Sequence, residues 1–341
     1  MVPHLSREAQ GIGFGILGVV GFSLTLPASR EAVPYFGAII VAFGRAVIAA
    51  ILAAGVLLAR REPLPKRRQL LSLVVVAAGA IVCFPLLSAW AMDRLPASHG
   101  AVILALLPSF TAGASAVRNG ERPSVAFWIA SVAGAATVLG YAIFTGFGRP
   151  QPPDLALILA DLILAVAYAE GGRLSTQLGG WQVIAWALVL AGPFLLVLAI
   201  MAIPAHIESI PVKPWVALLY LGIGSQFLAF VAWYTGMSLG GVAHISQMQF
   251  LQPFLTIVFS ALLLHERITA VTAAAAVVTV GVVVLGKKTA VRTSILRDTN
   301  GVTVPPTDCN TFQCGVESET FLFTLYTASL CFIRYCDSES R

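Results

Sequence analysis

The protein has 341 residues, of which 58% are hydrophobic and 11% are charged, and its formal net charge is +5 at pH 7. Soluble domains carry about 25% charged residues, so this composition excludes a soluble globular protein. The 30 Gly and 19 Pro residues are spread through the apolar stretches, as is usual in packed transmembrane helices. The composition therefore predicts a polytopic α-helical protein embedded in a lipid bilayer.

Apolar stretches of about 20 residues are long enough to cross the hydrocarbon of a bilayer, and ten of them follow one another along the chain. Short connections with turn-forming residues separate them, such as Gly148-Arg149-Pro150 and Gly240-Gly241. We expect an all-α membrane protein with ten transmembrane helices. Their expected limits are 10–26, 34–59, 69–92, 97–117, 123–147, 153–174, 179–203, 212–238, 242–264 and 269–286.

Lys and Arg residues near the ends of these helices are distributed unequally. Basic residues are retained in the cytoplasm, and far more of them lie on the side of the N-terminus, so we expect both termini to be cytoplasmic. We expect a plasma (inner) membrane because the sequence shows no organelle signal. Nucleic-acid binding would need these residues clustered with aromatics on a soluble face, and we expect none. The residues on the N-terminal side are Arg7, Arg60, Arg61, Lys66, Arg67, Arg68, Arg118, Arg122, Arg173, Lys287, Lys288, Arg292 and Arg297, against Arg30, Arg94, Arg149, Lys213 and Arg267 on the other.

The two halves of the sequence match each other at a constant offset of 145 residues. Rare residue types recur at this offset, which indicates a duplication. Because each half has an odd number of spans, the second half enters the membrane upside down, as in secondary transporters that work by alternating access. We expect a first repeat at 1–148 and an inverted second repeat at 149–288. The matching pairs are Gly79 and Gly224, Met92 and Met237, His99 and His244, Pro108 and Pro253, Ser115 and Ser260, and Glu121-Arg122 and Glu266-Arg267.

Several motifs resemble those of the EamA-like family in the drug/metabolite transporter superfamily. The stretch LALLPSF at 104–110 and the sequence GERP at 120–123 are similar to the family's proline-bearing fourth helix and the junction after it. The second copy reads FLQPFL at 250–255 and HERIT at 265–269, with His265 where the family usually has Gly. Arg45 resembles the arginine often carried by the second helix. The resemblance covers roughly 10–288.

This resemblance implies a secondary transporter that exports amino acids or related metabolites. Some members of the family export aromatic and hydrophobic amino acids, and these are one candidate substrate class. Drug or toxic-compound efflux is the alternative within the family. An intramembrane enzyme or a structural membrane protein is the alternative outside it, but the sequence has none of the nucleophile, metal or phosphate-binding motifs of an enzyme or ATP-driven pump. We expect a non-enzyme without cofactor or metal, a small-molecule partner, and a plausible monomer.

Two charged residues fall deep inside the expected spans. Arg45 lies close to mid-bilayer, where an unpaired charge costs from about 3 to more than 10 kcal/mol. Asp161, in the sixth span, lies at a similar depth. The two form either a structural ion pair between the halves or a substrate-binding or coupling site, and the sequence leaves both readings open.

Two pairs of residues at equivalent positions are candidates for gating. His99 and His244 lie near the starts of the fourth and ninth spans. They are expected either to act as symmetric gates or to pack against or cap neighbouring helices. Because an imidazole titrates near pH 6.5, a role in proton coupling is also chemically possible. Pro108 and Pro253 interrupt the same two spans. Their equivalence favours hinges of a moving element over static kinks.

Polar side chains in spans eight and nine have no partners in lipid and are expected to face inward. With three aromatic side chains they are candidates to line a mainly apolar substrate pocket, although Trp and Tyr also concentrate at the membrane interface. The polar set is Gln226, Gln247, Gln249, Gln252 and Tyr234, and the aromatic set is Phe84, Trp90 and Trp186.

The tail at 289–341 differs in composition from the rest of the chain and holds four of the five cysteines, Cys309, Cys314, Cys331 and Cys336. Their spacing is not that of a standard zinc finger, and no histidine accompanies them. The apolar run at 321–333 is too short to span a membrane. We expect a cytoplasmic tail that is disordered or foreign to the transporter.

Overall fold

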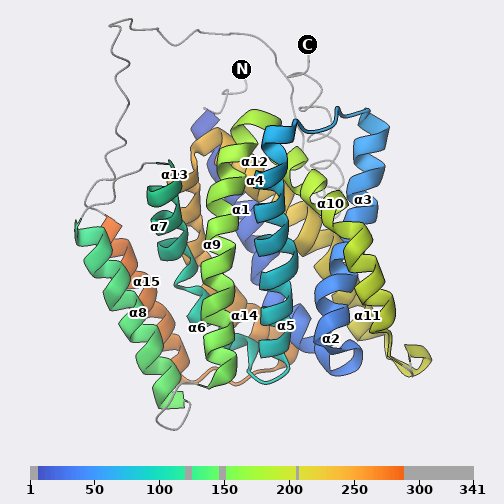
Figure 1. Cartoon of the computed structure of the whole chain (residues 1–341). Coiled ribbons are helices and arrows are strands. Elements are labelled where there is room, and N and C mark those ends of the chain that lie inside the picture. Colours follow the sequence, from blue (N-terminus) through green and yellow to red (C-terminus); the bar gives the residue numbers. More distant parts are fainter. Residues whose placement is uncertain (1–6, 120–124, 146–150, 205–206, 288–341) are drawn as a thin grey trace, which may run out of the picture. The chain divides into compact units, whose positions relative to one another are not determined.

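The computed structural model describes residues 7–119, 125–145, 151–204 and 207–287. Within these ranges every regular element is a helix and none is a strand (Figure 1). The tail at 289–341 lies outside the described residues, as do Glu121, Arg122 and Gly148. The all-helical prediction is confirmed for the described part of the chain.

The first two expected spans form one long helical run from Arg7 to Arg60. It consists of α1 (Arg7–Ser23), α2 (Thr25–Ile39), the π-helical segment η1 (Ile40–Gly44) and α3 (Arg45–Arg60). The run breaks at Gly37, where the φ angle of 74° lies in the left-handed region open to glycine.

Helix α2 passes through residues 27–33, which the sequence analysis placed between the first two expected spans. Arg30 Nη1 donates to the carbonyl of Met92 at 2.5 Å, and Lys213 Nζ donates to Glu31 Oε2 at 2.8 Å. Pro27 stands in the first turn of α2, where its missing N–H costs no helical hydrogen bond. The two charged residues Arg30 and Glu31 of α2 therefore have partners far away in the sequence.

The remaining helices follow in the expected order. In the first half they are α4 (Arg67–Val76), η2 (Ala77–Cys83), α5 (Phe84–Met92), α6 (Ala97–Leu104), α7 (Leu107–Asn119) and α8 (Val125–Thr145). In the second half they are α9 (Pro152–Leu178), α10 (Gly180–Met201), η3 (Ile207–Ser209), α11 (Val212–Leu219), η4 (Tyr220–Ala229), α12 (Phe230–Gly240), α13 (Val242–Ile245), η5 (Ser246–Leu251), α14 (Gln252–Leu264) and α15 (Ala270–Lys287).

Six helical runs in the described residues are long and apolar enough to cross a membrane. The run from Arg7 to Arg60 counts once although it has 54 residues, about 81 Å of helix at 1.5 Å per residue and far more than one crossing needs. Shorter apolar helices lie at Val132–Thr145, Met248–Leu264 and Ala270–Gly281. The protein is thus a multi-pass membrane protein, and the number ten stays a prediction.

Contacts between helices repeat from one half to the other. Helix α1 packs against α12 and η4, and the corresponding α9 packs against α5 and η2. Likewise α2 packs against α5, while α10 packs against α12. The pairs α3 with α10, α6 with α14, and α8 with α15 each join helices that belong to equivalent expected spans of the two halves. Figure 1 shows α8 and α15 side by side at one edge of the bundle.

Irregular backbone also recurs at equivalent positions. The π-helical η2 and η4 contain Gly79 and Gly224, which are separated by the 145-residue offset. Helix α6 ends at Leu104, and α7 begins at Leu107 after two i to i−3 hydrogen bonds. In the second half the 3₁₀-helical η5 precedes α14 in the same place. The halves therefore share their breaks as well as their contacts.

Glycines permit the close approach of α1 and α12. A Cβ atom on Gly11 would lie 2.8 Å from the backbone nitrogen of Gly240, and one on Gly236 would lie 2.9 Å from that of Gly15. Small residues at such crossings are typical of packed membrane helices, because they let the backbones meet. The first helix of one half is thus fixed against the third helix of the other.

His265 ends α14 in a left-handed conformation with a φ angle of 54°. This conformation favours glycine over residues with a Cβ atom. The position is the one at which the sequence departs from the usual glycine of the family it resembles, so this chain tolerates local strain there.

We call the end of the bundle where α4 begins and α7 and α9 end the basic end, because Arg67, Arg118 and Arg173 lie there. The end where α6 and α9 begin is called the opposite end. Figure 1 shows these two ends at the top and bottom of the bundle.

Candidate substrate site

A small cavity lies between the two halves, midway along α9. Its lining comes from both repeats, with residues of α1, α2, α3, α5, α6 and α7 from the first half and of α9, η4, α12 and α14 from the second. The cavity has room for the centre of a water molecule over only about 10 Å³, about enough for one water. Its lining comprises Phe22, Thr25, Arg45, Phe84, Leu104, Leu107, Leu164, Tyr168, Ser225, Phe230 and Gln252.

Arg45 supplies the only charge among the residues that line this cavity. Its side chain is buried, with 2% of the residue exposed. Arg45 Nη2 donates to Ser225 Oγ at 3.3 Å, and Ser225 Oγ is hydrogen-bonded to Thr25 Oγ1 at 2.7 Å. Arg45 Nε has no hydrogen-bond partner among the described atoms. A buried cation with an unused donor is costly unless an anion joins it.

Arg45 and Asp161 do not form the ion pair that the sequence left open. Both carboxylate oxygens of Asp161 lack a hydrogen-bond partner in the described part of the chain, and the residue is fully buried. Asp161 is also absent from the residues that line the cavity. The two charges are therefore held apart in this conformation.

Aromatic side chains form one wall of the cavity and continue behind it. The rings of Phe22 and Phe230 lie 4.8 Å apart in an edge-to-face arrangement, and Tyr168 lies 6.0 Å from Phe230. Trp233 and Tyr234 extend this cluster between α1, α9 and α12. Each such aromatic pair contributes about 0.5–1.5 kcal/mol of stability beyond the burial of its apolar area. The cluster therefore holds this wall of the cavity in a defined arrangement.

Of the predicted pocket residues, Arg45 and Phe84 line the cavity, and Gln252 from the polar set joins them. Gln226 is buried beside it, with Nε2 donating to the carbonyl of Ala80 at 3.2 Å. Gln249 is buried with neither amide atom bonded, and the hydroxyl of Tyr234 donates to the carbonyl of Ala167 at 3.4 Å. These three face inward but do not line the cavity in this conformation.

The other predicted residues lie elsewhere. Trp90 stacks with the guanidinium of Arg94, 4.4 Å from its ring centre, near the opposite end. Trp186 is half-buried on α10 and outside the cavity lining. The side chains of Gln247 and His244 lie outside the described atoms. The position of Trp90 therefore fits the alternative that this tryptophan lies at the membrane interface.

His99 takes part in a polar cluster at the opposite end. His99 Nε2 lies 2.8 Å from Asp154 Oδ1, and its ring packs 4.8 Å from that of Tyr141. The hydroxyl of Tyr141 is hydrogen-bonded to Thr272 Oγ1 at 3.1 Å. The cluster thus ties together α6, α8, α9 and α15 near their ends.

Glu266 adds a second tie at the same end. Its carboxylate accepts hydrogen bonds from the backbone nitrogens of Ala97 at 2.8 Å and Ser98 at 3.0 Å. These are the first N–H groups of α6, and an anion at a helix N-terminus is favoured by both the free donors and the helix dipole. Glu266, two residues after the end of α14, therefore caps the helix that carries His99.

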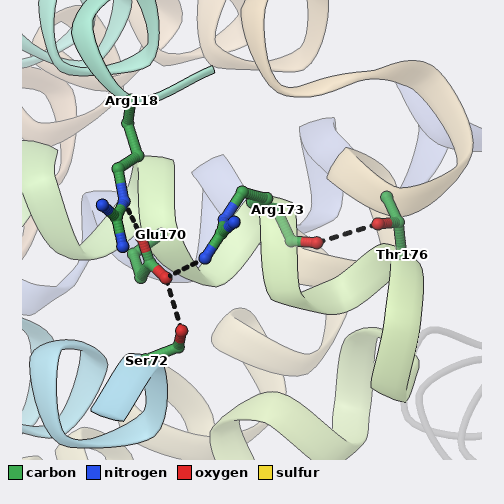
Figure 2. A network of polar contacts seen from close by, with 5 residues as sticks. All are labelled: Ser72, Arg118, Glu170, Arg173 and Thr176. Carbon is green, nitrogen blue, oxygen red and sulfur yellow. Dashed lines mark hydrogen bonds and ion pairs between the residues drawn. The ribbon is translucent and has the colours of Figure 1, made fainter. Parts of the chain in front are cut away.

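A third polar network lies at the basic end and is centred on Glu170 of α9 (Figure 2). Glu170 Oε1 accepts from Arg173 Nη2 at 2.8 Å and from the hydroxyl of Ser72 on α4, and Oε2 accepts from Arg118 Nε on α7. The Glu170 side chain is 2% exposed, whereas Arg118 and Arg173 reach solvent. One carboxylate therefore holds α4, α7 and α9 together.

A larger groove lies between α7, α9 and α8, next to this network. It has a volume of about 540 Å³ and is lined almost wholly by apolar side chains, among them Phe110, Trp128, Val132 and Val166. Arg118 and Glu170 stand at its edge. The central cavity is the better candidate for a polar metabolite because Arg45 has an unused donor there, whereas Arg118 and Glu170 at the groove are paired with each other.

Pro108 and Pro253 each stand in the first turn of the helix that follows a break. Pro108 is the second residue of α7, and Pro253 is the second residue of α14. A proline there costs no helical hydrogen bond and prevents the preceding turns from continuing as one helix. Leu104 and Leu107, on either side of the first break, line the central cavity.

Replacing Pro108 or Pro253 with Ala is expected to let each broken span close into a more continuous helix and to slow transport, with expression intact or improved. The reason is that alanine regains a backbone donor and favours the helix. Initial transport rates in proteoliposomes would measure the effect. Full activity in both single variants and in the double variant would contradict a hinge at these prolines.

Several cavity residues were not singled out from the sequence. Tyr168 and Leu164 lie within an apolar run, and Thr25 and Phe22 come near the first span's expected end, so nothing in the pattern distinguishes them. Ser225 was recognisable only as the neighbour of Gly224, one of the residues matched between the halves.

The sequence matches the EamA-like transporter family twice, over residues 9–143 and over residues 151–286. The chain belongs to the EamA-like transporter family. This confirms the resemblance found in the sequence motifs. The two matched ranges correspond to the halves whose contacts repeat in the structure.

Two relatives of this EamA-like protein are similar over most of their length. The chain is 40% identical over 264 residues to the uncharacterized transporter YdeK of Bacillus subtilis (strain 168), covering 77% of this chain and 92% of that protein. It is 25% identical over 260 residues to a probable terminal-alkyne amino-acid exporter of Streptantibioticus cattleyicolor, covering 74% of this chain and 84% of the other.

A solved crystal structure of a protein shares the fold. It has a TM-score of 0.60 and 21% sequence identity, and the alignment covers 82% of this chain and 99% of the other. At this identity the similarity concerns the fold alone.

Proposed function

We propose that this EamA-like transporter exports amino acids or related metabolites across the plasma membrane by alternating access. The family makes the protein a transporter. Amino acids as substrates are supported by the similarity to a probable amino-acid exporter and by the chemistry of the central cavity. The nature of the substrate and the mechanism are the proposed part.

The observation that carries the substrate class is the buried Arg45 with a free donor in a cavity that holds no acidic residue. A carboxylate fits the planar guanidinium because it can accept two parallel hydrogen bonds. Thr25, Ser225 and Gln252 offer further polar contacts, and Phe22, Phe84 and Phe230 offer apolar ones. Together they match an amino acid with a hydrophobic side chain.

The repeated contacts and breaks support an inverted-repeat mechanism. In such proteins the substrate site lies between the repeats near the midplane and is exposed to each side in turn. The central cavity lies between the repeats, and it is too small in this conformation for a substrate larger than water. We propose that the structure represents an occluded state and that opening toward either end enlarges the cavity.

The networks at the two ends are suitable gates for such a cycle. Glu170 ties α4, α7 and α9 at the basic end, and the His99–Asp154 pair with Glu266 ties α6 at the opposite end. In this proposal the hydrogen bond between His99 and Asp154 helps to keep the opposite end closed. In the proposed cycle one network opens while the other stays closed.

Efflux of hydrophobic compounds is a second candidate, and the apolar groove between α7, α8 and α9 favours it. Its volume of about 540 Å³ is within the usual range of about 300–1,000 Å³ for small-molecule sites. If the groove admits substrate, Val132→Trp should block transport of hydrophobic drugs. If the central cavity alone binds substrate, this variant should transport amino acids normally.

Reconstituted protein in liposomes tests the proposal directly. Vesicles containing the purified chain would be loaded with unlabelled phenylalanine, leucine or tryptophan and exposed to the same labelled amino acid. Saturable uptake of label that protein-free vesicles lack is the expected result. No exchange of any amino acid, with exchange of drug-like compounds instead, would favour the second candidate.

The orientation predicted from the basic residues can be tested by labelling single cysteines. A cysteine near Gln69 or Lys287 should react only from the cytoplasmic side, and one near Gly148 only from outside, because the basic residues cluster on the side of the N-terminus. Membrane-impermeant maleimides applied to intact cells and to inverted vesicles would measure this. Labelling of Gly148 and Lys287 positions from the same side would contradict two inverted five-helix repeats.

A further inference from the structure

Asp161 is a buried acid for which the proposed substrate site has no use. The residue is fully buried in the middle part of α9, and neither carboxylate oxygen has a hydrogen-bond partner among the described residues. An ionised carboxylate in such a place is very costly, and a neutral carboxylic acid is far less so. The environment therefore selects the form that carries a proton.

Asp161 lies on the face of α9 that leads to the central cavity. Leu164 and Tyr168 follow it at spacings of three and seven residues, which place all three on one side of the helix. Leu164 and Tyr168 line the cavity with Arg45. Asp161 is thus about one helical turn from a cavity residue.

Tyr168 connects the acid with the arginine. Its phenol lies within electrostatic range of both Arg45 and Asp161, although these two do not contact each other. A change in the charge of Asp161 therefore acts on a side chain that lines the cavity.

The titratable groups on the described helices around α9 have other partners or lie at the ends of the bundle, except for the free thiol of Cys83. The side chain of His244 on α13 lies outside the described atoms. The described helix α5 and helix α10 contain none. The others are His99 on α6, paired with Asp154; Arg118 on α7, paired with Glu170; Tyr234 on α12, bonded to Ala167; the half-buried Cys83 on η2; and Arg67 and Arg68 at the exposed start of α4.

We infer that Asp161 is the binding site of a proton that is coupled to transport. In the occluded state the carboxyl is protonated. This holds for the substrate-free transporter. When the cavity opens to one side and water reaches α9, the O–H bond breaks and the proton passes to water. The carboxylate then remains while substrate is carried, and a proton from the other side neutralises it when the cavity opens there. One proton is exchanged in each cycle. This inference rests on the proposed transport function, but the protonation of Asp161 can be measured without a substrate.

The first test is infrared spectroscopy of the purified protein. A protonated carboxylic acid has a C=O stretch distinct from that of a carboxylate, so the difference spectrum between wild type and Asp161→Asn at pH 7 should contain one carboxylic-acid band. Asp161→Glu should retain a shifted band. Asp93→Asn, which removes an exposed acid on the same protein, should leave the band in place. Absence of the band in wild type would overturn the proposal.

The second test separates coupling from transport in proteoliposomes, with the membrane potential clamped by potassium and valinomycin. A step of about one pH unit should let wild type accumulate labelled phenylalanine about tenfold, since one pH unit is about a tenfold difference in proton activity and one proton is exchanged for each substrate. Asp161→Asn should lose this accumulation, whereas counterflow, which needs no net proton movement, should remain detectable. Asp161→Glu should retain the accumulation.

These outcomes distinguish the two proposals. No counterflow in wild type would refute phenylalanine as a substrate and leave the infrared result as the test of the proton site. Normal pH-driven accumulation by folded Asp161→Asn would refute the proton site and leave the transport function intact. If Asp161→Asn does not fold, as judged by size-exclusion chromatography, the shifted band of Asp161→Glu decides the question.

Discussion

Replacing Arg45 with Lys is expected to leave the protein folded and to lower its affinity for a carboxylate-bearing substrate by about tenfold to a hundredfold. Lys keeps the charge but cannot make the two parallel hydrogen bonds of a guanidinium. A hydrogen bond to a charged group contributes about 1.5–3 kcal/mol, and each 1.4 kcal/mol corresponds to about a factor of ten. Binding of candidate amino acids to purified protein would measure the loss.

A matched control is available on the same chain. Arg94 is exposed, and its guanidinium contacts only its neighbours Asp93 and Trp90 among the described contacts. Arg94→Lys should therefore bind substrate like wild type. Equal binding by Arg45→Lys and wild type would contradict a bidentate carboxylate contact at Arg45.

Because Arg45 and Asp161 do not contact each other, replacing both is expected to have additive effects on the stability of the protein. Residues without a shared contact usually have additive effects, whereas breaking a buried ion pair is partly recovered when both partners are removed. The double variant Arg45→Ala with Asp161→Ala should therefore show the sum of the two single changes in thermal unfolding. A double variant that loses less stability than this sum would indicate an ion pair between the two residues. Normal transport by that variant would end the substrate-binding hypothesis for Arg45.

Replacing Glu170 with Gln is expected to open the basic end of the bundle. The amide keeps the size of the side chain but removes the charge that holds Arg118 and Arg173, and it weakens three hydrogen bonds (Figure 2). Because both arginines reach solvent, the loss is smaller than for a fully buried pair. A change of about 1.4–3 kcal/mol in the closed state corresponds to about tenfold or more in the open population.

Cysteine reactivity would measure this opening. In a variant without the native cysteines, a single cysteine at Leu107, which lines the cavity, should react with a soluble maleimide about ten times faster when Glu170 is Gln. The matched control is Glu31→Gln, which removes the Lys213 ion pair elsewhere in the protein and should not change the rate. An unchanged rate in Glu170→Gln would show that this network is structural and does not act as a gate.

The sequence by itself determined the class of protein and its internal symmetry. Apolar stretches of membrane length need no tertiary information, because lipid forces every span to satisfy its own backbone hydrogen bonds. The duplication was visible in rare residues such as His99 and Pro108, and the breaks before α7 and α14 confirm that Pro108 and Pro253 mark equivalent interruptions. The motifs were sufficient for the family, which the matches over both halves show.

Only the tertiary structure decided which residues meet. The sequence places Asp161 and Arg45 at a similar depth in the membrane. Whether their side chains point at each other depends on how each helix is rotated about its own axis. The periodicity within one helix does not determine its rotation relative to another. The same holds for Glu170, whose partners come from three helices, and for His99, whose partner Asp154 lies 55 residues away. Contacts of this kind depend on helix packing at interfaces of small residues such as Gly11 and Gly240, which sequence pattern alone does not orient.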